Sequence, residues 1–196
     1  MTTAHSPRVQ QVGDAAITVL ARDGARGLTH RAVDDAAGLP PGTTSNHART
    51  RAALLTLTLS RIAELDAADG QRQLPEMPVS ATGLADVLAR LLHRTISDDA
   101  ARLRLLARFE LAFEATRRPE LRVIYDDMGG SFRAQAAILL AAAGSADPDR
   151  DAWALIAWLE GTAFYAIAGA GAPDTPSAGA LRTQLANLLT SMGCRR

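Results

Sequence analysis

Apolar residues recur at helical spacing along most of the chain, and no segment shows the apolar–polar alternation of a strand. A first helix is expected from about Pro7 to Asp23, where Gly24 ends it. Further long helices are expected at about 49–69, 81–96, 98–117, 119–143, 148–170 and 177–193. Residues 70–80, which include Pro75 and Pro78, are expected to form a linker. The pattern predicts an all-α fold.

The segment 28–55 departs from this pattern, because its middle carries almost no apolar side chain. Thr29 is expected to cap a short helix and Gly38 to end it, since glycine tolerates the left-handed conformation of a helix end. Pro41 suits the start of a second short helix, from Gly42 to about Ala48. Burial stabilises such a polar helix little, so hydrogen bonding to DNA is the better reason for it. We predict a helix-turn-helix whose second helix enters the major groove.

The residues expected at this DNA surface fall into two groups. Base edges or adjoining phosphates are expected to be contacted by Thr43, Thr44, Asn46 and His47. The phosphate backbone is expected to be held mainly by Thr29, Arg31, Arg49 and Arg51, and the predicted surface also includes Pro41, Gly42 and Ser45. Thr50 is placed to cap the helix that follows. His30 is expected to be a solvated surface residue.

These residues carry a resemblance to a known family. The segment is similar to the DNA-binding domain of TetR-family transcriptional repressors, which it matches without a gap at Gly38, Leu39, Gly42, Thr43, His47, Arg49, Arg51, Leu54 and Leu55. Three positions depart from the family pattern: Ser45 replaces a phosphate-contacting tyrosine, Ala48 an aromatic residue, and Asp34 a small residue. The resemblance implies a homodimer that binds operator DNA and is released by a small molecule.

Charge and cysteine content narrow the possibilities further. The net charge is zero, but residues 1–51 carry six arginines against four aspartates, and the remainder is correspondingly acidic. Zero net charge argues against non-specific, nucleoid-type DNA binding. Cys194 is the single cysteine, so no intrachain disulfide is expected, which fits a reducing compartment. With no signal peptide and no apolar run of about 18 residues, we expect a cytoplasmic protein without a membrane partner.

Two domains are expected: a DNA-binding domain at 1–51, joined by a connecting helix at about 49–69, and an effector-binding and dimerisation domain at 70–196. The last two helices carry apolar stripes that are expected to meet their symmetry mates in a four-helix bundle. The interface is expected to contain Trp153, Ala157, Phe164, Leu181, Leu185, Leu188 and Met192. The alternative is that both stripes pack on the core of their own subunit.

A small-molecule pocket is expected among the helices after residue 80. Glu110 and Glu160 fall on apolar helix faces, where a carboxylate needs either an arginine partner or a ligand. Besides Glu110, the candidate lining is His93, Phe109, Phe113, Tyr125, Met128, Phe132, Trp158 and Tyr165, each with plain core packing as its alternative. Gly129–Gly130 is expected either to kink its helix or to allow close packing.

No enzyme motif is expected to act here. The histidines have no metal-ligand spacing, and no nucleophile elbow, P-loop or dinucleotide fingerprint occurs. We therefore expect no enzyme activity, no cofactor and no metal. The sequence predicts a ligand-responsive regulator that binds a palindromic operator as a homodimer. The alternative is a helical small-molecule-binding protein, or an enzyme, with a vestigial DNA-binding domain.

Overall fold

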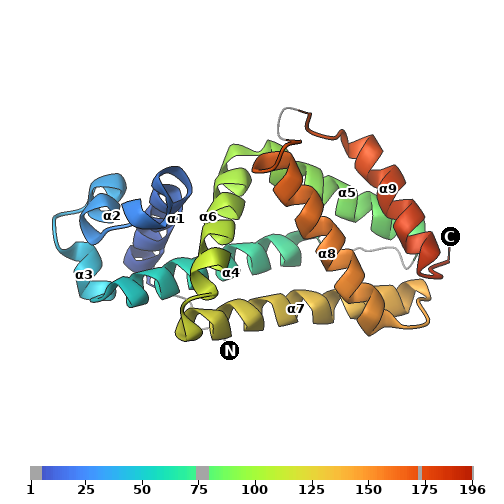
Figure 1. The fold of residues 1–196 in the computed structure, drawn as a ribbon, viewed down its shortest axis with the longest axis horizontal. Helices are drawn as coiled ribbons and strands as arrows, with labels where there is room; N and C mark the ends of the chain where they lie inside the picture. Colours follow the sequence, from blue (N-terminus) through green and yellow to red (C-terminus); the bar gives the residue numbers. More distant parts are fainter. Residues whose placement is uncertain (1–5, 74–79, 172–173, 196) are drawn as a thin grey trace. The chain divides into compact units, whose positions relative to one another are not determined.

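The computed structural model describes residues 6–73, 80–171 and 174–195. Over these residues the chain forms nine helices and no strand, which confirms the all-α prediction (Figure 1). The helices are α1 (Pro7–Gly27), α2 (His30–Ala37), α3 (Thr43–His47), α4 (Arg51–Gln73), α5 (Ala81–Ser97), α6 (Asp99–Ala115), α7 (Pro119–Ala143), α8 (Pro148–Ile167) and α9 (Ala178–Ser191).

The helix boundaries lie close to those that the periodicity predicts. The bounds of α7 agree at both ends, and α3 is a single short helix after the glycine turn, as expected. Helix α4 continues to Gln73, so the first residues of the predicted linker are helical, while Pro75 and Pro78 lie outside the described residues. The Gly129–Gly130 pair lies inside an unbroken helix, and neither glycine has a positive φ. A kink at this pair is therefore not observed.

The chain divides into two compact units. The first unit comprises residues up to Asp69 together with Leu103–Asp127, and the second comprises Gly70–Arg102 and Met128–Arg196. The first unit thus contains α1 to α3, nearly all of α4, most of α6 and the beginning of α7. Its fully buried side chains include Leu20, Leu28, Leu54, Leu55, Leu59, Ile62, Leu111 and Leu121.

In the second unit, α5 packs along α9 and also contacts α8 (Figure 1). The segment after α9 joins the α5 and α7 ends through main-chain hydrogen bonds. The Ala81 amide donates to the Arg195 carbonyl at 2.8 Å, and the Arg195 amide donates to the Ala143 carbonyl at 2.9 Å. Leu84, Ile96, Leu140 and Leu155 are among the large fully buried side chains of this core. None of the described helices is long and apolar enough to cross a membrane.

Candidate DNA-binding helix

The turn between α2 and α3 is built as its sequence predicts. The Thr29 hydroxyl accepts a hydrogen bond from the Ala32 amide and caps α2. Gly38 ends α2 in the left-handed conformation, with φ at 63° and ψ at 35°. The Thr50 hydroxyl in turn accepts from the Ala53 amide at the start of α4. These caps fix where α2 begins and ends and where α4 begins, because each satisfies a backbone group that has no partner inside its helix.

The side chains of α3 and its first flanking residue divide into an outer and an inner side. Asn46 and His47 are exposed, and Thr43 and Ser45 are half-buried. Thr44 is fully buried, with 0% of its surface exposed, so the expectation that it contacts DNA is corrected. The buried Ala48 follows directly after α3. The exposed polar side chains, rather than the whole helix, are therefore available to bind DNA.

Asp34 is the partner of Thr44. It is 2% exposed, and its carboxylate accepts from the Gly42 amide at 2.7 Å, the Thr44 amide at 2.8 Å and the Thr44 hydroxyl at 2.6 Å. Burial alone would raise the pKa of Asp34, but these hydrogen bonds and the charge of His30 outweigh it and lower the pKa. Asp34, one of the three residues that depart from the family pattern, thus holds the first turn of α3.

His30 lies one turn earlier on α2 and is half-buried rather than solvated, which corrects its expected place. Its Nε2–H donates to the Ala48 carbonyl, because a carbonyl can only accept. Sequence reasoning missed the roles of both residues. The available signal was their spacing, since His30 and Asp34 fall on the same side of α2 as the apolar Val33 and Ala37.

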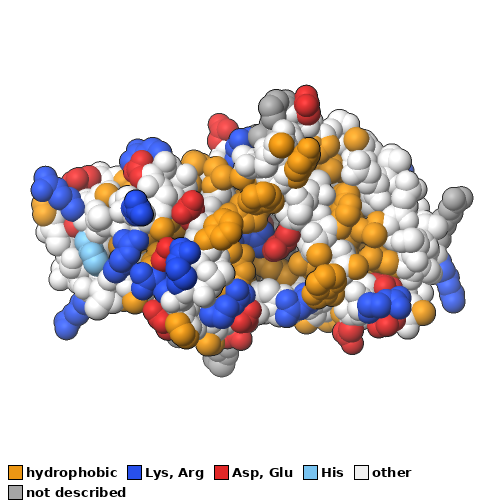
Figure 2. All heavy atoms as spheres, in the orientation of Figure 1, with side chains coloured by type: hydrophobic (Ala, Val, Ile, Leu, Met, Phe, Trp, Pro, Cys, Tyr) orange, Lys and Arg blue, Asp and Glu red, His pale blue; other side chains and the backbone are white. Residues whose placement is uncertain are grey.

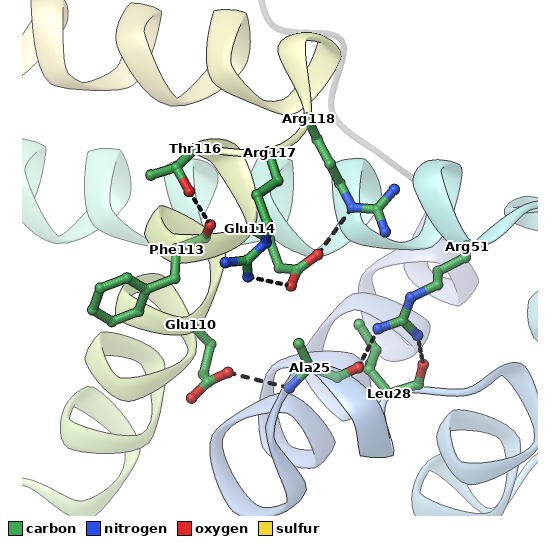
Figure 3. A network of polar contacts seen from close by, with 9 residues as sticks. All are labelled: Ala25, Leu28, Arg51, Glu110, Phe113, Glu114, Thr116, Arg117 and Arg118. Atoms are coloured by element: carbon green, nitrogen blue, oxygen red, sulfur yellow. Dashed lines mark hydrogen bonds and ion pairs between the residues drawn. The ribbon is translucent and has the colours of Figure 1, made fainter.

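Arg51, at the start of α4, points into its own unit. Its guanidinium donates to the Leu28 carbonyl at 2.8 Å and also to the Ala25 carbonyl (Figure 3). The Ala25 carbonyl lies in the last turn of α1, after Gly24 interrupts the helix with φ 68° and ψ −178°, and Leu28 follows that turn, so both carbonyls lie at the connection from α1 to α2. Arg51 was expected to bind phosphate. With both terminal nitrogens engaged, it instead braces this connection.

Glu110, on α6, meets the same connection from another helix of the first unit. Its Oε2 accepts from the Ala25 amide at 3.2 Å (Figure 3). An amide partner satisfies the carboxylate without the arginine or the ligand that its apolar surroundings suggested. Arg104 adds a second link from α6, since its guanidinium pairs with Asp66 at 2.8 Å and also with Asp69, both on α4.

The other predicted DNA contacts lie at the surface. Thr29, Pro41, Gly42 and Arg49 are exposed, and 90% of the Arg31 side-chain surface is accessible beside Asp35. Figure 2 shows arginine side chains and a histidine on the surface that covers α2, α3 and the start of α4. Positive charge next to an exposed polar helix is the arrangement that phosphate binding requires.

The residues predicted to line a pocket are divided between the two units. The first unit holds Phe109, Glu110, Phe113 and Tyr125, and the second holds His93, Met128, Phe132, Trp158 and Tyr165. Neither unit alone therefore holds the whole predicted lining. On α8, Glu160 lies about 160° around the helix from Trp158, whereas Tyr165 lies only about 20° from it. Trp158 and Tyr165 can thus share a face, whereas Glu160 lies within about 60° of Trp153, Ala157 and Phe164 on another face of α8.

The residues predicted for a dimer interface also separate into two groups. Leu181, Leu185 and Met192 are buried within the subunit itself, and Leu188 is half-buried. Leu181, Leu185 and Met192 therefore fit the alternative expectation, in which the α9 stripe packs on the core of its own subunit. On α8, Trp153 (67% exposed), Ala157 and Phe164 (41% exposed) lie within about 40° of one another and face outward.

Comparisons with known proteins identify the family of this chain. The family model described as "Tetracyclin repressor-like, C-terminal domain" matches residues 79–191. A TetR-family member from Streptomyces coelicolor A3 is 30% identical and has a TM-score of 0.73, with 93% of this chain and 98% of that chain covered. The multidrug binding protein EbrR, complexed with ethidium, is also 30% identical, with a TM-score of 0.68 and coverages of 92% and 98%.

A transcriptional regulator from Rhodococcus sp. Rha1 shares the fold at 20% identity and a TM-score of 0.79, with 96% of this chain and 98% of that chain covered. No curated protein matches the chain. The family model covers more than half of the chain, and solved structures at 30% identity cover nearly all of it. The chain therefore belongs to the TetR family of transcriptional regulators.

Proposed function

We propose that this protein is a homodimeric repressor that binds a palindromic operator through α3 and leaves it when a small molecule binds. The observation that carries the proposal is the exposure of Asn46 and His47 on a short helix whose inner residue, Thr44, is buried and satisfied. Asn46 and His47 read base edges, while Arg31, Arg49, Thr43 and Ser45 hold adjoining phosphates.

Asn46 gives the sharpest test of sequence reading. Asn46→Ala is expected to change the preferred sequence at one position and to weaken operator binding by about 1–3 kcal/mol, since asparagine can form a bidentate contact with adenine. The measurement is selection of a preferred site from a random duplex library, followed by a salt titration on that site. An Asn46→Ala protein that selects the same site as the natural chain would remove Asn46 from base reading.

Arg49→Ala is the matched control for that test. Loss of a phosphate contact should weaken binding to all sequences alike and lower the slope of log affinity against log salt by about one unit. If the natural chain shows no salt-dependent binding to any duplex, including DNA upstream of its own gene, the alternative of a vestigial DNA-binding domain is favoured.

The proposed homodimer forms through the outward face of α8. Trp153, Ala157 and Phe164 place three exposed apolar residues on one face of that helix, which also carries Glu160, and exposed apolar residues gathered on one face usually mark an interface. Two copies related by a twofold axis would bury this face against itself, and would carry two recognition helices to successive major grooves.

The proposed effector is an aromatic cation. EbrR, at 30% identity, has been solved in complex with ethidium and with proflavin, both flat cationic dyes. In this chain Trp158 and Tyr165 share one side of α8, and aromatic faces attract cations as well as flat rings. The carboxylate of Glu110 already accepts from Ala25, so stacking on aromatic rings is the better basis for binding here.

Trp158→Ala is expected to weaken ethidium binding at least tenfold, because it removes the larger of two stacking surfaces. Dye fluorescence titration measures the affinity, and loss of the operator complex on adding dye measures the response. Trp153→Phe is the control, since Trp153 lies about 140° away around α8 and its loss leaves Trp158 as the sole tryptophan reporter. Equal dye affinity in Trp158→Ala and the natural chain would exclude this face as the site.

A further inference from the structure

Helix α3 lacks most of what normally holds a helix in place. It has five residues, its N-cap is Gly42, which has no side chain to offer, and Thr44 is its one buried residue. Isolated helices much shorter than about 12 residues are not stable in water, and a polar helix gains little from apolar packing. The position of α3 therefore has to be fixed by groups outside it.

Helix α2 supplies those groups at both ends of α3. The Asp34 carboxylate accepts from the Gly42 and Thr44 amides at the N-terminal end, and His30 donates to the Ala48 carbonyl at the C-terminal end. The two residues are four apart, or about 6 Å along α2, which suits a five-residue helix about 7.5 Å long. We call this pair, His30 and Asp34, the α2 clamp.

The same aspartate also fixes the turn that leads to α3. The Asp34 carbonyl accepts from the Gly38 amide at the end of α2 and from the Leu39 amide at 2.9 Å. Its carboxylate replaces the capping side chain that glycine cannot provide, and it satisfies the buried hydroxyl of Thr44 at 2.6 Å. One residue of α2 thus sets both where the turn ends and how the next helix is oriented.

We propose that the α2 clamp is a positioning device for DNA recognition: His30 and Asp34 set the position and tilt of α3 without touching DNA. This inference rests on the proposed function of α3. Because recognition depends on placing Asn46 and His47 within hydrogen-bond reach of base edges, a small rotation of α3 removes specific contacts first. Phosphate contacts from flexible arginines at the surface tolerate the same rotation, so general affinity for DNA persists.

Asp34→Asn tests the clamp with little change in volume. The amide group keeps one oxygen for Thr44 but turns an N–H toward the Gly42 amide, so that two donors meet. We expect operator affinity to fall at least 30-fold, while affinity for unrelated duplex changes less than threefold. Amide hydrogen exchange at Gly42 and Thr44 should accelerate in the DNA-free protein. Asp35→Asn, at the exposed neighbouring position, should change neither the two DNA affinities nor the amide hydrogen exchange.

The ratio of the two affinities separates positioning from a loss of folded protein. Partial unfolding removes active molecules and weakens operator and unrelated DNA by the same factor, so their ratio stays constant. A misplaced α3 lowers the ratio at least tenfold in a protein with unchanged helical circular dichroism. An unchanged ratio in Asp34→Asn overturns the inference. Failure of the natural chain to bind any operator overturns the proposed function instead.

Variants of His30 provide a second test of the α2 clamp in case Asp34→Asn does not fold. His30→Gln keeps an N–H donor for the Ala48 carbonyl and is expected to retain operator discrimination within about threefold. His30→Leu has similar size without a donor and is expected to lower discrimination at least tenfold. Equal discrimination in the two variants contradicts a clamp at this end of α3.

Discussion

Arg51→Leu is expected to lower the free energy of unfolding of the first unit by about 3 kcal/mol, one of the two largest effects predicted for the chain. The substitution removes the donor from the Leu28 and Ala25 carbonyls, and hydrogen bonds to charged groups contribute about 1.5–3 kcal/mol each. The connection between α1 and α2 then loses its link to α4. Urea unfolding followed by circular dichroism, with amide exchange over residues 25–32, measures the change.

Arg31→Leu is the matched control, because its side chain is 90% exposed beside Asp35 and surface pairs of this kind contribute at most about 1 kcal/mol. The two variants should each lose a different property. Arg31→Leu should keep its stability and lose one unit of salt slope in DNA binding, whereas Arg51→Leu should lose stability. Arg51→Lys keeps the charge without the planar fork and should fall between them. If the Arg51→Leu protein is as stable as the natural chain but has a reduced salt slope, Arg51 contacts DNA phosphate rather than stabilising the first unit.

Trp153→Asp is expected to convert the protein into a monomer and to reduce operator affinity at least 100-fold. The substitution replaces the most exposed large apolar side chain of this α8 face with a charge, which a partner copy would cover and remove from water. A monomer also loses the gain in affinity that comes from linking two recognition helices. Light scattering after size-exclusion chromatography gives the mass, and titration of a full operator and a half-site gives the affinities.

Val123→Asp is the control for that experiment. Val123 lies on α7 and is 61% exposed, so it offers a comparable exposed apolar residue outside the proposed interface. It should remain dimeric with unchanged operator affinity. A dimeric Trp153→Asp protein would show that another surface joins the two copies. A monomeric Trp153→Asp protein that still binds the full operator as the natural chain does would show that operator binding does not require the dimer.

Local sequence chemistry accounts for most of the helix boundaries. Thr29 and Gly38 delimit α2, because a hydroxyl cap and a left-handed glycine each satisfy backbone groups within a few residues. The break at Gly24 is predictable for the same reason, although three further residues continue as a helical turn. Such signals need no knowledge of distant residues.

Long-range partners were not predictable in this way. The sequence marks Glu110 as a carboxylate on an apolar face, but its partner is an amide 85 positions away on another helix. Arg51 looks like any other basic residue near a helix start until the fold brings two carbonyls to its guanidinium. Thr44 reads as one more polar residue of α3, and only packing against α2 reveals that it faces inward.

The amino-acid sequence by itself determined the all-α class, the glycine turn and the polar character of the recognition helix, since these follow from periodicity, capping and composition. Tertiary structure decided which polar side chains remain free for DNA and which serve the protein itself. A hydrogen bond depends on distance and direction between two groups, and the order of residues along the chain does not specify either of them for helices that meet only after folding.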